Sequence, residues 1–347
     1  MHNKETIGFL KSFLGDLFDP GLDEAEISQI IENLSNHMPE IVNQSAAILT
    51  ASLQRSSRAM LRRQRRDLRG FRRRHSRLWQ PALDALETCC KLATEAGQIF
   101  VDKHKVSAGE TLDYQFQALS RLHARACQVA AEVVELLRGG FADGANARWR
   151  TLHEIAVISL FLTESGCDVA QRYTEYRAVQ AYRDAATFQE KAQVLGYDPY
   201  SEDEMRSIKS ERDRLVECYG DPFGKPYGWA ASELKDANPT FVKVEASVGL
   251  SHHRPYFRMA NQSVHSGPEA LEFQLGNPKS HVLLVGPSNY GLADPGQSTA
   301  ISIHQVAGAL LLTKMGFEEL VTLQVINGYV DEVMSCFTKV NAEVQED

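Results

Sequence analysis

The stretch RMANQSVH carries an arginine and a histidine, Arg258 and His265, with six residues between them. On a continuous helix seven positions turn through about 700°, so both side chains would lie on one face, about two turns apart. Asn261 and Gln262 would lie on that face too, and their amides could hold a phosphate or the imidazole. Histidine exchanges protons near neutral pH, and arginine stabilises charge on a phosphate. The pair is therefore suited to cleaving a phosphodiester without a metal ion.

Two similar pairs occur elsewhere in the chain, Arg69 with His75 and Arg148 with His153. The first pair belongs to a run of arginines. The second pair differs by five positions, about 140° on a helix, so its side chains diverge unless the helix is broken. Arg258 is the last arginine of the chain and stands apart from any charge run. It is therefore the arginine of the candidate catalytic pair.

Histidines elsewhere give no strong metal-binding motif. His153 and Glu154 begin like the helix of a zinc protease, but the second histidine of that motif is missing. His252 and His253 could bind a metal together with His265, yet adjacent side chains point apart on regular backbone. We therefore expect no metal and no cofactor.

Residues 55–77, RSSRAMLRRQRRDLRGFRRRHSR, hold eleven arginines and one acid, so this segment carries a charge of +10 in a chain of net charge −8. Arginine, unlike lysine, binds phosphate and carboxylate groups in a bidentate manner. The segment therefore predicts contact with nucleic acid, salt bridges to the acidic surface of the protein or of another protomer, or a solvated face. The arginines that we expect to contact RNA are Arg62, Arg65, Arg66, Arg69, Arg72 and Arg73.

An apolar stripe runs beneath these charges, with Leu61, Leu68, Phe71 and Leu78 at spacings of seven, three and seven. This spacing is typical of a helix with one narrow packing seam. We expect the seam to pack against another protomer, giving a homo-oligomer, a dimer or higher. Trp79 or Phe71 could alternatively stack on an RNA base.

The composition is that of a globular protein, with 43% hydrophobic residues. The longest apolar run, IAVISLFL, is far shorter than the roughly 20 residues that cross a bilayer, and the charged start is unlike a signal peptide. The six cysteines are scattered without a CxxC pair, as in reduced cytosolic proteins. We expect a cytoplasmic protein with no membrane contact.

Apolar residues at helical spacing predict an all-α, multi-helix bundle with an N-terminal helical extension. Short helices are predicted in the first fifty residues, split at Asp19-Pro20-Gly21, and Pro81 is expected to start a new helix that ends near Lys103. The later predicted helices are LDYQFQALSRLHARACQVAAEVVELL, ARWRTLHEIAVISLFL, DVAQRYTEYRAVQAYRDAATFQEKAQVL, a short one near Val242 to Ala246, Gly296 to Lys314, and Phe317 to Val340.

Two segments interrupt this helical pattern. CYGDPFGKPYGW, with three glycines and two prolines, predicts a loop, and long loops tend to carry function. HVLLVGPSNYG predicts a strand or short β-hairpin near 280–290. The expected division is a small helical region at 1–54, an Arg-rich helix at 55–80 and a main bundle at 81–347.

The succession RWRTLHEIAVISLFL, RYTEYRAVQAYRD and NQSVHSGP resembles a widespread family of helical bacterial proteins catalogued as a domain of unknown function. The resemblance covers roughly Leu112 to Val340. It implies a helical bundle whose polar interior is shared by Arg150, Glu154, Tyr173, Tyr176, Ser263 and His265.

A more distant resemblance links the Arg258/His265 spacing to the HEPN superfamily of ribonucleases and nucleotidyl-modified toxins. It implies that His265 acts as a general base or acid on a ribose 2′-hydroxyl and its leaving oxygen, while Arg258 stabilises the phosphorane. No metal is then needed, and two protomers bring their motifs together at a dimer interface. The resemblance implies a metal-independent endoribonuclease, a toxin or phage-defence effector with an operon-encoded partner protein.

The alternative is a non-catalytic binding or scaffold protein in a stress or defence system. The polar residues of the bundle would then form a buried hydrogen-bond network that fixes the register of the helices. An open surface at Arg258 and His265 favours the enzyme. A buried pair bonded to Glu154 favours the scaffold.

Overall fold

The computed structural model describes residues 24–105, 113–265, 267–272, 274–277 and 284–346. The chain divides into two compact units, residues 1–71 and 72–347. Within these described ranges every regular secondary-structure element is a helix. One isolated β-bridge joins Gln274 to Asn277. The prediction of an all-α protein is confirmed.

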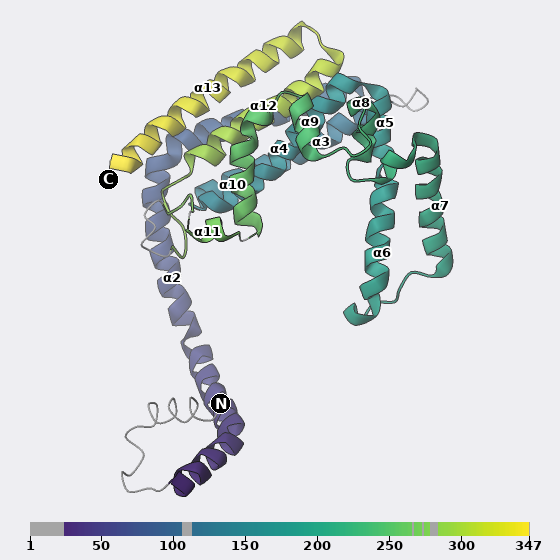
Figure 1. Ribbon diagram of the computed structural model, residues 1–347. Coiled ribbons are helices and arrows are strands. Elements are labelled where there is room, and N and C mark those ends of the chain that lie inside the picture. The colour runs from purple at the N-terminus through teal and green to yellow at the C-terminus, as the bar shows by residue number, and fades with distance from the viewer. Residues whose placement is uncertain (1–23, 106–112, 266, 273, 278–283, 347) are drawn as a thin grey trace. The chain divides into compact units, whose positions relative to one another are not determined.

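Figure 1 shows the elements in chain order. They are α2 (Glu24–His104), α3 (Tyr114–Arg138), α4 (Ala142–Ser165), α5 (Cys167–Glu175), α6 (Arg177–Leu195), α7 (Glu202–Tyr219), the 3-10 turns η1 (Asp221–Gly224) and η2 (Gly228–Ala230), α8 (Ala231–Leu234), α9 (Phe241–Ser247), η3 (Ser251–His253), α10 (Arg254–His265), α11 (Pro268–Glu272), α12 (Ala293–Leu311), η4 (Leu312–Lys314) and α13 (Phe317–Glu346).

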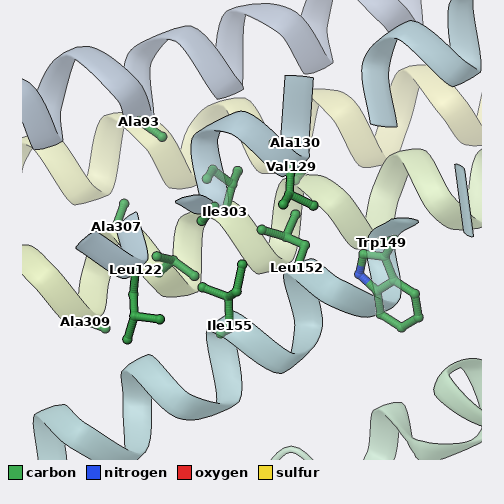
Figure 2. Close-up of a cluster of buried hydrophobic side chains, with 14 of the residues drawn as sticks. Ala93, Leu122, Val129, Ala130, Trp149, Leu152, Ile155, Ile303, Ala307 and Ala309 are labelled. Atoms are coloured by element: carbon green, nitrogen blue, oxygen red, sulfur yellow. The ribbon is translucent and has the colours of Figure 1, made fainter. Parts of the chain in front are cut away.

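The core of the second unit lies where α3, α4 and α12 pack together (Figure 2). Small residues such as Ala130 and Ala307 are fully buried at these contacts, and they let the helix backbones approach closely. Larger side chains, among them Leu152 and Ile303, fill the space between the helices and are also fully buried. This packing makes α4 a rigid support for the polar residues that it carries.

Helix α2 corrects one prediction, because it continues through Pro39 and Pro81 rather than beginning anew at the second proline. A proline inside a helix removes one backbone hydrogen bond. Trp79 and Ala82, on either side of Pro81, are both fully buried and hold the helix against the bundle. This tertiary packing outweighs the local preference for a break.

The predicted strand or hairpin near 280–290 is also wrong over the part that the structure describes. Residues 280–283 lie outside the described ranges, and 284–290 are irregular, with bends and no strand. Gly286 has φ +124°, which interrupts an extended backbone. The amide of Ser288 donates to the carbonyl of Gly140 at 2.9 Å, so this loop is held by the end of α3 rather than by a strand partner.

The helix predicted over DVAQRY to QVL is two helices, α5 and α6, with Tyr176 between them. The tyrosine is buried, and its ring packs edge-on against Phe223 at a centroid distance of 5.6 Å. Helix α7 runs beside α6 (Figure 1). Among the helices described, none combines the length and the apolar character needed to span a membrane.

Candidate functional site

Helix α10 carries the predicted catalytic pair, and both Arg258 and His265 are exposed. The helix is continuous between them, so they lie on one face, about two turns apart. Neither side chain forms a hydrogen bond or ion pair with another residue of the described ranges. Asn261 and Ser263 are half-buried on the same helix.

A cleft of about 560 Å³ lies beside this helix, and Arg258 and Ser263 line it while His265 does not. Three carboxylates, those of Asp143, Glu269 and Glu272, also line the cleft. Asp143 accepts hydrogen bonds from the backbone amides of Leu275 at 2.9 Å and Gly276 at 3.2 Å. The cleft is therefore more acidic than basic. A phosphate would bind more favourably on the open face of α10 than in this cleft.

Arg150 and Glu154 form an ion pair one turn apart on α4, with Nη2 and Oε1 2.9 Å apart. The Arg150 guanidinium also lies 5.1 Å from the centroid of the Phe257 ring on α10. Burial raises the pKa of Glu154, and the charge of Arg150 partly offsets this. Glu154 is therefore bound to Arg150, and it makes no described contact with His265.

A second polar cluster, which we call the buried triad, consists of His153, Glu245 and Arg254. His153 Nε2 and Glu245 Oε1 lie 2.8 Å apart, and Arg254 forms an ion pair with the other carboxylate oxygen. The side chains of His153 and Glu245 are only 1% exposed. The rings of Phe241 and Phe257 stack at 5.2 Å, and the Arg254 guanidinium lies over both. The triad thus ties α4, α9 and α10 together and is closed to substrate.

Burial sets the protonation of the histidines around the triad. It lowers the pKa of His153 and outweighs the opposing effect of Glu245, so the ring is neutral at pH 7. A neutral ring next to a carboxylate donates its Nε2–H to it. Burial together with the neighbouring His252 and His153 lowers the pKa of His253 to about 4. No group of three or more histidine, cysteine or acidic residues within the described ranges could hold a metal ion.

Tyr173 and Tyr176 line a separate cavity of about 590 Å³, which we call the arginine–tyrosine cavity. Its charged lining residues are Arg121 on α3 and Arg177 and Arg183 on α6. The predicted polar residues are therefore divided among the α10 face, the Arg150/Glu154 pair and this cavity. Tyr227 also lines this cavity, and its pKa is raised chiefly by burial and further by Glu154 and Tyr176.

The predicted RNA-contacting arginines all lie on α2 and are exposed. Within the described residues 24–71, none of the seven arginines at 55–69 forms an ion pair with an acidic residue of that unit, and the four arginines at 72–77 form none with the described acidic residues of theirs. Two of them bond to their own helix, because Arg62 Nε donates to the carbonyl of Arg58 and Arg69 Nε to that of Arg65, both at 3.2 Å.

Sequence reasoning missed the buried triad and the three arginines of the cavity. His153 was considered as a metal ligand and as a partner of Arg148, and Glu245 lies 92 positions away from it. The cavity had a recognisable signal, because Arg177, Gln180 and Arg183 recur at a spacing of three on one helix face. The loop that contributes Tyr227 to the cavity was predicted as a functional loop.

Residues 116–281 match the model of a family described as a family of unknown function, DUF5677. No curated protein matches the chain, and no solved structure matches it. The family match falls within the region of the predicted resemblance to a domain of unknown function and agrees with it. It gives no support to the HEPN resemblance.

Proposed function

We propose that this protein binds RNA through the arginines of α2. The observation that carries the proposal is the one-sided placement of these residues. At about 100° per residue, six of the seven arginines between positions 55 and 69 fall within a sector of about 100° around the helix. These six are Arg55, Arg58, Arg62, Arg65, Arg66 and Arg69, and we call them the arginine face.

The chemistry of this face suits a phosphate backbone. Guanidinium groups bind phosphate oxygens in a bidentate manner and remain charged at any physiological pH. Arg62 and Arg69 are exposed and have no acidic partner within the described residues 24–71, so their charges can bind a polyanion.

Fluorescence anisotropy of a labelled single-stranded RNA, titrated with the full chain, tests the proposal. The triple variant Arg62→Gln, Arg65→Gln, Arg69→Gln should weaken binding and flatten the salt dependence. Each lost phosphate contact on a single strand should reduce the slope of log K against log salt by about 0.7. A triple variant with the same loss of charge elsewhere, Arg125→Gln, Arg206→Gln, Arg214→Gln, is the matched control because these arginines are exposed and lie outside α2.

Equal weakening by the two triple variants would mean that net charge alone governs binding, and the arginine face would lose its role. Absence of RNA binding by the wild type at low salt would overturn the proposal. Binding of anionic lipid vesicles but not RNA would assign the face to a membrane surface instead.

A second candidate function is metal-independent cleavage of the bound RNA by Arg258 and His265. The observation that favours it is the exposure of both side chains on one face of α10, where neither is held by a described residue. His265 would move the proton of a ribose 2′-hydroxyl, and Arg258 would stabilise the phosphorane. A homodimer would bring two such pairs together, and a toxin or phage-defence role would follow from cleavage of cellular RNA. The alternative is a scaffold that binds RNA without cutting it.

Induced expression followed by growth and bulk RNA integrity separates cleavage from binding. Wild type should arrest growth and degrade RNA, while Arg258→Ala and His265→Ala should do neither and remain folded by circular dichroism. His252→Ala is the control for a lost exposed histidine. Purified protein should cleave RNA in EDTA. Intact RNA with a wild type that still binds it would favour the scaffold.

A further inference from the structure

The arginine–tyrosine cavity lies where α3, α4, α5 and α6 meet the loop that follows η1. Its lining residues are Gln117, Ala118, Arg121, Leu122, Ile158, Tyr173, Thr174, Tyr176, Arg177, Gln180, Arg183, Pro226, Tyr227 and Trp229. The volume of about 590 Å³ is within the range of small-molecule sites, roughly 300–1,000 Å³.

The charge of this cavity differs from that of the unit around it. Residues 72–347 carry 28 basic and 36 acidic residues, a net charge of −8. The lining of the cavity nevertheless has three arginines and no aspartate or glutamate. Glu175, which neighbours two of the lining tyrosines in sequence, is engaged outside the cavity lining by the hydroxyl of Tyr219 at 2.6 Å. A cavity of this charge favours an anionic ligand.

The three arginines of the cavity differ in their hydrogen bonding. Arg183 is anchored, since it donates to the carbonyl of Gly224 at 2.7 Å and to the hydroxyl of Tyr176 at 3.2 Å. Arg121 and Arg177 are exposed and form no hydrogen bond or ion pair within the described part of the chain. Two guanidinium groups on different helices are thus free to hold one phosphate from two sides.

Aromatic residues form the wall beside these arginines. Trp229 is buried, and its ring is fixed edge-on by Tyr173 at 5.0 Å and by Phe161 at 5.6 Å. Tyr173 and Tyr227 are half-buried, and their hydroxyls have no hydrogen-bond partner among the described residues. Such rings offer an apolar face and a polar tip to a planar ligand.

The backbone at Tyr227 is strained. This residue has φ 56° and ψ 20°, a left-handed conformation that residues other than glycine seldom adopt. The next residue is Gly228, where a Cβ would lie only 2.3 Å from the carbonyl oxygen of Pro222, so a larger residue would not fit. The Tyr176 hydroxyl donates to the carbonyl of Lys225 at 2.6 Å and ties the loop down. Strain of this kind persists where the surrounding structure enforces it, and it is common at binding sites.

We propose that the arginine–tyrosine cavity binds a nucleoside phosphate, with the phosphate between Arg121 and Arg177 and the base against Tyr173 and Tyr227. The paired guanidinium groups, the aromatic wall and the absence of lining acids each match one part of such a ligand. The ligand is either a free nucleotide or the phosphorylated end of an RNA strand. The proposal stands independently of RNA binding by the arginine face.

Isothermal titration calorimetry with the full chain tests the site. The probes are AMP, GMP, CMP and UMP, adenosine, inorganic phosphate, and RNA tetramers phosphorylated at the 5′ or the 3′ end. At least one nucleotide or phosphorylated tetramer should bind, and adenosine and phosphate should each bind at least about tenfold more weakly, since each makes only part of the contacts. Tighter binding of a tetramer than of any mononucleotide would identify an RNA end as the ligand.

Arg121→Ala and Arg177→Ala should each weaken binding about ten- to a hundredfold, because each removes charge-assisted hydrogen bonds to the phosphate. Arg125→Ala is the matched control, because Arg125 is exposed one turn further along α3 and does not line the cavity. Tyr227→Gly removes the ring at a backbone conformation that glycine adopts freely, so it should abolish binding while the protein stays folded.

Two results would overturn the proposal. One is the absence of binding by every nucleotide and tetramer tested. The other is binding that Arg121→Ala and Arg177→Ala leave unchanged. The triple variant of the arginine face, at Arg62, Arg65 and Arg69, should bind mononucleotides as the wild type does, so failure of one proposal does not count against the other.

Discussion

His153 on α4 donates a hydrogen bond of 2.8 Å to Glu245 on α9, and both side chains are 1% exposed. The carboxylate is held from its other side by Arg254, the first residue of α10. A buried carboxylate is costly unless it is fully paired. This arrangement therefore fixes the start of the helix that carries Arg258 and His265.

Glu245→Ala should destabilise the protein by about 3–5 kcal/mol, because it leaves the half-buried Arg254 charge and the buried His153 Nε2–H without their partner. Glu245→Gln keeps an oxygen for the hydrogen bond and should cost less. The measurement is urea unfolding followed by circular dichroism. Glu233→Ala, at an exposed acid, is the control and should change stability by less than about 0.5 kcal/mol. Equal midpoints for the Glu245 and Glu233 variants would show that the triad does not stabilise the fold.

The stability of the protein should fall as the pH drops from about 6.5 towards 4. Burial lowers the pKa of His123 from 6.5 to about 4, and burial also lowers the pKa of His153. A histidine with a depressed pKa in the folded state binds a proton more readily when the chain is unfolded. Its contribution to the free energy of unfolding is therefore fully present above its pKa in the unfolded chain. This contribution is lost as the pH falls through its pKa in the folded protein. For His123 this amounts to about 3 kcal/mol.

The variant His123→Leu should flatten this pH dependence, because the residue no longer titrates in either state. The measurement is the free energy of unfolding between pH 7.5 and pH 4.5 for wild type, His123→Leu and the control His265→Gln, at an exposed histidine. Identical slopes for all three proteins would refute the assignment to His123.

Helical periodicity predicted most of the fold, because a helix that buries one face repeats its apolar residues at three and four positions. Helices α12 and α13 begin within three residues of their predicted starts at Gly296 and Phe317. Helix α7 was overlooked, although Ser201 and Glu204 form a capping box that the sequence displays. The continuity of α2 through Pro81 could not be predicted, since it depends on tertiary packing around Trp79.

The candidate site was predicted less completely than the fold. The position of Arg258 and His265 on one helix face followed from their spacing, but their exposure did not. The pairing of His153 with Glu245 could not be derived, because it joins positions 92 residues apart. Spacing along one helix also could not show that Tyr173 and Arg121, on α5 and α3, line the same cavity.

Gly97→Ala should destabilise the protein although alanine favours helix. A Cβ at position 97 would lie 2.1 Å from Cε1 of His123, whose ring is buried and cannot move aside. Overpacking of this kind costs about 1–3 kcal/mol. Adding His123→Ala should relieve the clash, so a double-mutant cycle in urea should show coupling between the two positions.

The control is Gly328→Ala on α13, where the added Cβ meets nothing within 4 Å, so this variant should be neutral or slightly stabilising. Equal effects of the two glycine substitutions would contradict this account of the packing of α2 on α3.

The side of α2 outside the arginine face carries apolar residues. The predicted seam residues Leu61 and Leu68 lie outside the arginine sector, as do Leu53 and Met60, which are 61% and 57% exposed. Exposed apolar residues in a row on one helix mark a surface for another protein chain. If a second copy of this chain covers them, as the proposed homo-oligomer requires, Leu68→Asp should dissociate the oligomer by placing a charge in the contact. Ala59→Asp adds the same charge at the edge of the arginine face and should leave the oligomer intact. Sedimentation velocity distinguishes these outcomes, and a Leu68→Asp variant that sediments as the wild type does would rule out assembly through this seam.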